Sequence, residues 1–470
     1  MTDEPSSWPQ TIREAGTHFR NGSLSGVELT SHFLGGIEAL QPKLNAFITV
    51  TGDMALETAA ERDAELKAGK DRGPLHGIPI VIKDDTNVAG YPATVGSAIY
   101  KDRVPDEDAT VVKRLKDAGA VILGKTNMNE FAAGGRGGFN PHYGDSRNPW
   151  SLDHEPGGSS SGTGGAVAAR LCLGGTGTDA GGSVRGPAAR CGIVGIRPTF
   201  GRVSKIGIYP RCWSFEAIGP LARTVEDAAL MLNAMAGYDP TDPISLNAPE
   251  EDYTRELGQG VKGLRLGILN GFSLEDLDPP ILGAMKKAID TFSSLGAEIE
   301  HLDVPVFSDI LDAPALANII FYEFNQALGA DYHKAGKNLF GEIVHADMEK
   351  GAKTTKEAYE RAIAEKAERS KRIGEVFNNV DAFLTPTFPR MHMALSDPPD
   401  LSGNHRRFNI PMSYFGLPSV SQNCGFSGNG LPIGLQIVGN KLQESTVLRI
   451  AAAFEGATDF HDRRPPLCFQ

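Results

Sequence analysis

The chain has 470 residues, of which 40% are hydrophobic and 22% charged, as expected for a folded protein of two or three ordinary domains. Its 55 glycines and 30 prolines indicate many tight turns. The formal net charge of −12 argues against a broad nucleic-acid surface, and no run approaches the ~18 apolar residues of a membrane span.

The N-terminus and the cysteines both favour a cytoplasmic location. Residues 1–10 are acidic and have no apolar core, so we expect no signal peptide. The five cysteines are scattered and include no C-x-x-C pair, which is typical of a reducing compartment. We expect them to be small core residues rather than nucleophiles.

The first informative stretch is LHGIPIVIKDD, residues 75–85, which predicts a short apolar strand that ends at Lys83. A lysine at the end of a strand is usually a surface charge, so this residue does not indicate chemistry by itself. The next predicted element is a helix that begins near Asp108, a plausible N-cap, and ends at Gly119.

Two stretches resemble nucleotide-binding motifs and are rejected. Residues 119–126, GAVILGKT, match the G-x-x-x-x-G-K-[ST] pattern, but Ala, Val, Ile and Leu in the variable positions predict a buried strand rather than a phosphate loop. Residues 175–180, GTGTDA, resemble a dinucleotide fingerprint, but glycines and a serine follow where an apolar helix is required.

Small residues dominate PGGSSSGTGG, residues 156–165, which suits either a linker or a catalytic loop. The stretch runs directly into a helical pattern at residues 166–173, and this favours the loop. Farther on, GTDAGGSVRGPAA, residues 177–189, places Ser183 after two glycines. Unobstructed backbone N–H groups there suit an oxyanion hole, and a tight structural turn is the alternative.

The second half of the chain continues with strands and helices in alternation. A strand at residues 264–269 leads to a helix with Asp278 as its N-cap and Pro279 at its first position, and Gly296 ends the helix before another strand. A helix at residues 356–376 precedes a further strand. This order favours an α/β fold with a largely parallel sheet covered by helices.

Residues 238–253 contain prolines and acids with little periodicity, and they predict a domain boundary or a long surface loop.

A serine nucleophile needs a base. The three stretches at residues 75–85, 156–165 and 177–189 contain no histidine except His76. Because no Ser-His-Asp order surrounds it, lysine is the next candidate. Lysine can accept a proton only when it is uncharged, and the apolar strand before Lys83 would supply the burial that favours this form.

Together, GIPIVIKD, PGGSSSG, GTDAGGSVRGPAA and the later GLPIGLQIVG resemble the signature of the amidase signature family, serine hydrolases with a Ser-Ser-Lys triad. The likeness covers most of the chain and weakens between about residues 300 and 408. It implies a single amidase domain over residues 1–470, with a large mixed, mostly parallel sheet covered by helices on both sides. The catalytic core would lie at about 70–235 and a pocket-shaping region at about 300–408.

The resemblance also implies roles for individual residues. Ser183 would be the nucleophile and Lys83 the base, with Ser159 between them, its hydroxyl oriented by a cis peptide bond. Ser160 would support the hydrogen-bond network. The oxyanion hole would consist of the backbone N–H groups of Ala180, Gly181, Gly182 and Ser183.

At two positions the chain departs from the family pattern, which more often has glycine at the place of Ser161 and threonine at the place of Ala180. Neither change removes a catalytic group, so only the packing of the loops is put in doubt.

The expected function is hydrolysis of a small-molecule amide through an acyl-enzyme, without a metal or an organic cofactor. Residues 132–145, 209–219 and 309–329 would shape the pocket, and their aromatic and aliphatic content favours an apolar or aryl amide, with esters or carbamates as further substrates. A helix face that includes Ile319, Ile320, Tyr322 and Phe324 is, however, more often core than pocket.

Two alternatives stay open. The chain resembles the glutaminase-type component of a tRNA-dependent amidotransferase, which would need partner proteins because this acidic chain has no evident tRNA surface. From another class, it is compatible with an inactive binding or scaffold protein. A homodimer is also compatible with the sequence, whereas no nucleic acid or membrane partner is expected.

Overall fold

An eleven-stranded sheet runs through the computed structural model, which describes residues 8–311, 313–398 and 404–470. Three segments lie outside the described residues. Residues 1–7 belong to the segment considered for a signal peptide, and residues 312 and 399–403 belong to the expected pocket-shaping region. The strand order is β1-β3-β2-β4-β6-β5-β10-β11-β9-β7-β8. The strands are β1 (Phe47–Val50), β2 (Pro79–Lys83), β3 (Val121–Thr126), β4 (Gly174–Asp179), β5 (Val194–Arg197), β6 (Ala217–Ala222), β7 (Arg265–Leu269), β8 (Glu298–Leu302), β9 (Ala382–Pro386), β10 (Ser419–Phe426) and β11 (Pro432–Gly439).

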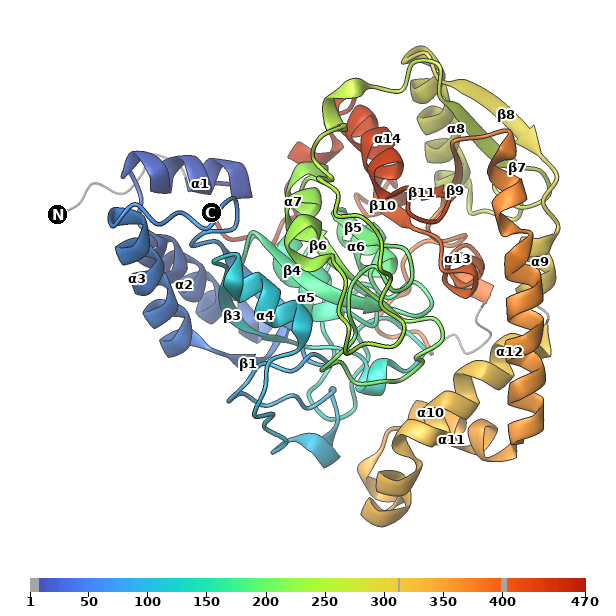
Figure 1. Ribbon diagram of the computed structural model, residues 1–470, viewed down its shortest axis with the longest axis horizontal. Coiled ribbons are helices and arrows are strands. Elements are labelled where there is room, and N and C mark those ends of the chain that lie inside the picture. Colours follow the sequence, from blue (N-terminus) through green and yellow to red (C-terminus); the bar gives the residue numbers. More distant parts are fainter. Residues whose placement is uncertain (1–7, 312, 399–403) are drawn as a thin grey trace.

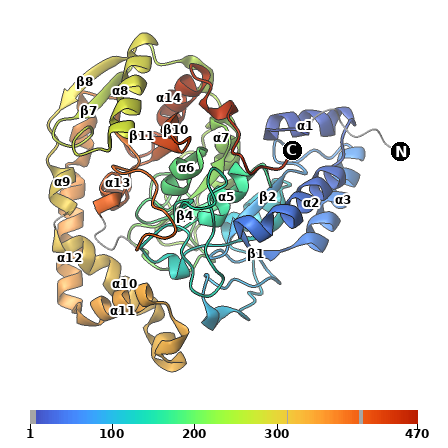
Figure 2. The same cartoon turned by 180° about the vertical axis from the view of Figure 1, so that it is seen from behind.

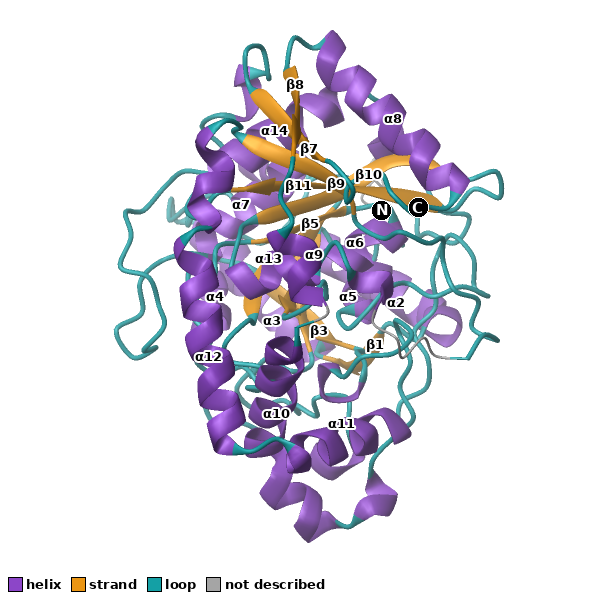
Figure 3. Ribbon diagram, turned by 90° about the vertical axis from the view of Figure 1, so that its right-hand side faces the viewer, coloured by secondary structure: helices purple, strands orange, loops and turns teal. Residues whose placement is uncertain are grey.

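Helices cover both sides of this sheet, with α4 and α7 on one side and α5 and α6 on the other (Figure 3). The helices are α1 (Ile12–Asn21), α2 (Gly26–Leu44), α3 (Gly52–Lys67), α4 (Thr110–Asp117), α5 (Ser161–Ala168), α6 (Arg185–Cys191), α7 (Val225–Met235), α8 (Pro279–Ser294), α9 (Val306–Leu311), α10 (Pro314–Ala335), α11 (Glu342–Lys353), α12 (Lys356–Lys371), α13 (Ile410–Phe415) and α14 (Glu444–Gly456). The predicted mixed α/β sheet with helices on both sides is therefore confirmed.

The sheet is less parallel than predicted. Among the described strands, only β2 with β3 and β4, and β7 with β8 and β9, pair in parallel, whereas the other six neighbouring pairs are antiparallel. The parallel pairs are joined by the helical crossovers that the periodicity shows. Of the antiparallel pairs, only β10 with β11 is joined by a short turn, and four pairs join strands that are not consecutive in the chain. Local sequence patterns do not show which distant strands become neighbours.

Local signals place several elements correctly. The predicted strand, helix and strand at residues 264–302 are β7, α8 and β8, with Asp278 at the N-cap position, Pro279 at the first helical position and Gly296 in the left-handed region after the helix. Asp108 is different, because α4 begins at Thr110 and the Asp108 carboxylate instead accepts hydrogen bonds from the Ala89 N–H and the Lys116 ammonium.

Both rejected nucleotide motifs are strands. Residues 119–126 form most of β3, with Lys125 fully buried, and residues 175–180 form most of β4. Residues 238–253, the predicted boundary or surface loop, contain no helix or strand in the described chain.

The small-residue stretch at residues 156–165 is not a linker, because its second half is the start of α5. Its glycines permit close contacts between chain segments. A Cβ atom on Gly162 would lie 2.2 Å from the Ala46 carbonyl oxygen, and one on Gly164 would lie 2.8 Å from the Pro187 Cβ. The small residues therefore allow α5 to pack directly against the backbone at Ala46 on one side and against the Pro187 ring on the other.

Helices α10, α11 and α12 form an arm beside the sheet, at the lower right of Figure 1. The same view, turned by 180° in Figure 2, shows the C-terminus close to α1. The arm meets the loops that follow β2 and β3 through a separate apolar cluster, which includes Met128, Phe131, Phe324, Leu328 and Val344. It is thus anchored by packing rather than by strand pairing.

Two further observations concern the helices and the cysteines. None of the described helices is long and apolar enough to cross a membrane. All five cysteines are free, and all except Cys468 are buried, as expected for core residues.

Gly219 in β6 provides a test of this packing. A Cβ atom there would lie 1.7 Å from the Ile196 carbonyl oxygen, whereas Gly283 in α8 is exposed and has no atom within 4 Å of such a Cβ. We expect Gly219→Ala to lower the free energy of unfolding by about 1–3 kcal/mol or more. Gly283→Ala should raise it by about 0.5–1 kcal/mol, since alanine is the better helix former. Thermal unfolding of both variants measures the difference, and equal stability would contradict the described contact.

Candidate active site

Lys83 lies at the end of β2, beside the parallel neighbour strand β4. Because parallel strands end at the same edge of a sheet, Lys83 comes to lie beside Thr178, near the end of β4. The Lys83 side chain is fully buried, and its Nζ donates hydrogen bonds to Ser159 Oγ at 2.8 Å and to Thr178 Oγ1 at 2.6 Å. The lysine is therefore not the surface charge that its position in the sequence also allowed.

A carboxylate accompanies this lysine, and the sequence motifs did not single it out. Asp85 Oδ2 lies 3.1 Å from Lys83 Nζ and also accepts a hydrogen bond from Thr178 Oγ1 at 2.7 Å. Burial is thus as predicted, but the surroundings of the amine are polar as well as apolar. Asp85 follows β2 in a turn, which is closed by a hydrogen bond from the Thr86 N–H to the Lys83 carbonyl. No side-chain alternation in the sequence therefore predicts this contact.

Ser159 is buried just before α5, and its peptide bond with Gly158 is cis, as the family resemblance implies. Its neighbours have other partners. Ser160 Oγ donates to the Thr178 carbonyl at 3.4 Å, and Ser161 Oγ is 3.3 Å from the carbonyl of Asn127. Of these three hydroxyls, the one hydrogen-bonded to Lys83 is that of Ser159.

Ser183 lies on the loop between β4 and α6 and is 5% exposed. Its carbonyl accepts the Ser160 N–H at 3.3 Å, so this loop lies against the segment that carries Ser159. The preceding Gly182 has φ +107°, and a Cβ atom there would lie 2.8 Å from the Asn409 Cβ. Both the backbone conformation and the crowding require glycine at this position.

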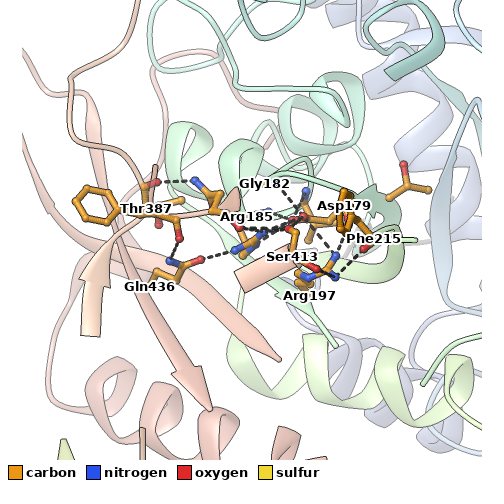
Figure 4. Close-up of polar contacts among 12 residues, drawn as sticks. Asp179, Gly182, Arg185, Arg197, Phe215, Thr387, Ser413 and Gln436 are labelled. Carbon is orange, nitrogen blue, oxygen red and sulfur yellow. Dashed lines mark hydrogen bonds and ion pairs between the residues drawn. The ribbon is translucent and has the colours of Figure 1, made fainter. Parts of the chain in front are cut away.

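The Ser183 loop is held by a buried ion pair (Figure 4). Asp179 at the end of β4 receives two hydrogen bonds from the Arg185 guanidinium, at 2.8 and 3.0 Å, and lies 3.6 Å from Arg197. Burial opposes ionisation of Asp179, but the two guanidinium groups and the hydrogen bonds outweigh it and hold the pKa of this carboxyl well below its usual range. Asp179 is therefore a fixed negative charge at the base of the loop.

The same network reaches the C-terminal strands. Arg185 also donates to Gln436 Oε1 at 2.7 Å and to Ser413 Oγ at 2.8 Å. Gln436 in turn donates to Thr385 Oγ1 and to the Phe408 carbonyl, both at 2.8 Å (Figure 4). Residues more than 200 positions apart in the sequence thus fix the position of one short loop.

One member of the expected oxyanion hole is already engaged. The Gly182 N–H donates to Asp179 Oδ1 at 2.8 Å, so it points towards this carboxylate. An N–H group that donates to a buried carboxylate is not free to donate to a substrate oxygen. The predicted role of Gly182 in an oxyanion hole stays a prediction, and in this structure its N–H is engaged by Asp179, unlike those of Ala180, Gly181 and Ser183 among the contacts of the described residues.

Ser183 also lines a cavity of about 420 Å³, large enough for a small ligand. Its walls include residues from all three segments that were expected to shape a pocket. Residues of α11 and of the segment 405–410 complete the walls, and these fall within or at the end of the broader pocket-shaping region predicted at about 300–408. The helix face that was expected to belong to the core or to the pocket contributes to both. Ile319 and Phe324 are fully buried in the core, whereas Ile320 lines the cavity.

Glu216, just before β6, is a further buried group near the lysine. Burial raises its pKa to about 7, and repulsion by Asp85 acts in the same direction, while Lys205, Lys83 and Arg211 oppose the shift. This carboxyl therefore changes charge near neutral pH. Among the described residues, no three His, Cys, Asp or Glu side chains are grouped so that they could hold a metal ion.

Comparisons with known proteins give matches over most of the chain. Residues 28–448 match the family model described as Amidase. The A chain of the glutamyl-tRNA(Gln) amidotransferase from Geobacter metallireducens is 40% identical over 479 residues, which cover 97% of this chain and 98% of that protein.

Two solved structures show the same fold. Native peptide amidase from Stenotrophomonas maltophilia matches with a TM-score of 0.85 and 32% identity, over 99% of each chain. A protein from a vestigial complex, described in connection with the origins of an s-triazine catabolic enzyme, matches with a TM-score of 0.88 and 30% identity, over 95% of this chain and 98% of that one.

The Asp179 network can be tested through stability. We expect Asp179→Asn to lower the free energy of unfolding by about 3–5 kcal/mol, because two buried guanidinium groups lose their counter-charge. Asp276, which pairs with Arg390 at the surface, is the matched control, and Asp276→Asn should change the melting temperature little. A similar small change in both variants, measured by thermal unfolding, would show that the buried ion pair does not hold the loop.

Proposed function

The chain belongs to the amidase signature family, and we propose that it hydrolyses a carboxylic amide through an acyl-enzyme on Ser183. The observation that carries this proposal is the buried contact between Lys83 Nζ and Ser159 Oγ, 2.8 Å, next to the loop where Ser183 lines a cavity. A hydroxyl linked to a buried amine is a route by which a proton can leave a second serine.

In the proposed reaction, uncharged Lys83 takes a proton from Ser159, and Ser159 takes one from Ser183 as Ser183 Oγ attacks the substrate carbonyl. The same relay returns a proton to the leaving amine when the C–N bond breaks. Water then adds to the acyl-enzyme, gives its proton to the relay and releases the acid. Each step transfers one proton between neighbouring groups, and no redox partner is required.

Backbone N–H groups of the Ser183 loop would stabilise the oxyanion. Ala180, Gly181 and Ser183 are the proposed donors, while Gly182 supports the loop through its bond to Asp179. Asp85 and Thr178 would hold the amine in place, since Thr178 contacts both Lys83 and Asp85.

The substrate class is proposed from the cavity walls. Ile320, Phe321, Ile343 and Ile410 supply apolar surface, which supports an amide with an apolar or aryl part. Esters and carbamates would pass through the same acyl-enzyme or carbamoyl-enzyme chemistry. The free cysteines support a cytoplasmic location.

A second candidate function is that of the glutaminase component of a glutamyl-tRNA(Gln) amidotransferase, favoured by the 40% identity over nearly the whole chain. A stable heterocomplex on co-purification would support it, together with glutaminase activity that depends on partners. Full turnover of simple amides by the isolated chain would favour a stand-alone amidase. Absence of both turnover and serine labelling would favour an inactive binding protein.

Labelling with an uncharged fluorophosphonate tests the assignment of the nucleophile. We expect one adduct, on Ser183, by mass spectrometry. Lys83→Ala should slow labelling and amide turnover by about 10²–10⁴-fold, because the general base is lost. The control Ser161→Ala removes a nearby hydroxyl that does not contact Lys83, and its rate should stay close to that of the natural chain. An adduct on another residue would contradict the proposal.

The charge of Glu216 predicts a pH effect. Above pH 7 its carboxylate adds a negative charge near the proposed reaction centre, where it opposes the negative charge that develops on the substrate oxygen during the attack. We therefore expect Glu216→Gln to be a few-fold faster than the natural protein above pH 7 and similar to it below pH 6. Rates of Ser183 labelling between pH 5 and 9 measure this, and parallel profiles would refute it.

A further inference from the structure

The cavity beside Ser183 carries more positive than negative charge, although the chain as a whole is acidic. Its described lining includes three cationic side chains and two carboxylates. The remaining walls include apolar side chains, small residues and the side chains of His405, Cys212 and Ser183. The charged residues are Arg211, Lys350, Arg406, Glu342 and Asp347.

Two of the cations have a carboxylate partner. Arg211 is buried, pairs with Asp347 at 2.7 Å and lies over the Phe324 ring at 4.1 Å. Lys350 lies 3.7 Å from the same carboxylate, and its side chain is 54% exposed. Asp347 is thus neutralised from two sides, and Glu342 is exposed to solvent.

Arg406 differs from both. Its Nε donates to His405 Nε2 at 3.0 Å and one Nη2 hydrogen reaches the Gly135 carbonyl at 3.5 Å. No carboxylate in the described ranges lies within 4 Å of this guanidinium, and Nη1 has no acceptor there. Burial lowers the pKa of Arg406, but a guanidinium stays charged in proteins.

A partly buried guanidinium with free N–H groups, which lines the same cavity as Ser183, is suited to a carboxylate, because it can bind one through two parallel hydrogen bonds. Among the described residues that line the cavity, Asp347 is already paired and Glu342 is exposed, so neither is an inner carboxylate that would receive an ammonium group. A substrate with a negative charge and no neighbouring positive charge fits this arrangement best.

We propose that the substrate carries a carboxylate that binds Arg406, so that the enzyme prefers the half-amide of a dicarboxylic acid. This inference rests on the proposed amide hydrolysis at Ser183. The apolar walls would contact the carbon chain between the two ends. Water would convert the half-amide into the dicarboxylate and ammonia.

Glutaramate, glutaramide and L-glutamine test this preference, because they share one carbon skeleton. Glutaramide replaces the carboxylate by a neutral amide of the same shape, and L-glutamine adds an α-ammonium group. Succinamate and adipamate cover shorter and longer spacings. We expect the best half-amide to exceed its neutral diamide in kcat/KM by at least about tenfold, and glutaramate to exceed L-glutamine.

Arg406→Gln should raise KM for the half-amide by at least about tenfold while leaving the kinetics of the diamide nearly unchanged. Fluorophosphonate labelling of Ser183 should persist in this variant, which shows that the fold and the nucleophile are intact. Arg372→Gln is the matched control, since it removes the same charge from an exposed side chain outside this cavity. Arg406→Lys should restore part of the affinity.

Calorimetric titration with succinate, glutarate or adipate measures the carboxylate site without turnover. We expect the natural chain and the Arg372→Gln variant to bind the best of these, and Arg406→Gln to lose at least about tenfold in affinity. If no amide is hydrolysed but this loss is observed, the proposed hydrolysis fails and the carboxylate site stands. Equal binding by the natural chain and Arg406→Gln, no binding at all, or equal use of half-amide and diamide would overturn the inference.

Discussion

The buried charge of Asp179 is the constraint on which the site depends. A carboxylate removed from water is stable only when it is paired, and here Arg185 and Arg197 supply the positive charge. Because Arg185 is also bound to Gln436 and Ser413, the loop is held from the C-terminal half of the chain. The position of Ser183 is therefore a property of the whole sheet rather than of its own local sequence.

A second requirement is close approach of backbone segments. Gly162 and Gly164 let α5 pack against neighbouring main chain, and Gly182 adopts a conformation that other residues rarely take. These positions bring the Ser159 segment and the Ser183 loop together at the edge where β2 and β4 end. The small residues thus allow these segments to pack closely together. The proposed chemistry uses the hydroxyl groups that this packing brings near one another.

Part of this arrangement could be predicted from the sequence. Caps and periodicity are local, so β7, α8 and β8 were placed correctly, and Lys83, Ser159 and Ser183 were singled out from short motifs. The predicted cap at Asp108 and the mostly parallel sheet were wrong, because they depend on which segments become neighbours in the fold. Asp85 and Arg406 were missed for the same reason, since nothing in their local sequence shows what their side chains face. The oxyanion-hole role of Gly182 stays a prediction, and its N–H donates to Asp179 in this structure.

The arm of helices α10 to α12 contacts the rest of the molecule through an apolar cluster and a few polar contacts, such as that between Arg211 and Asp347. It supplies walls of the cavity but none of the groups proposed to move protons. Substitutions in the arm can therefore accumulate during evolution without disturbing the reaction centre. In protein engineering, exchange of this helical segment between homologues would be a route to new selectivity on an unchanged catalytic scaffold.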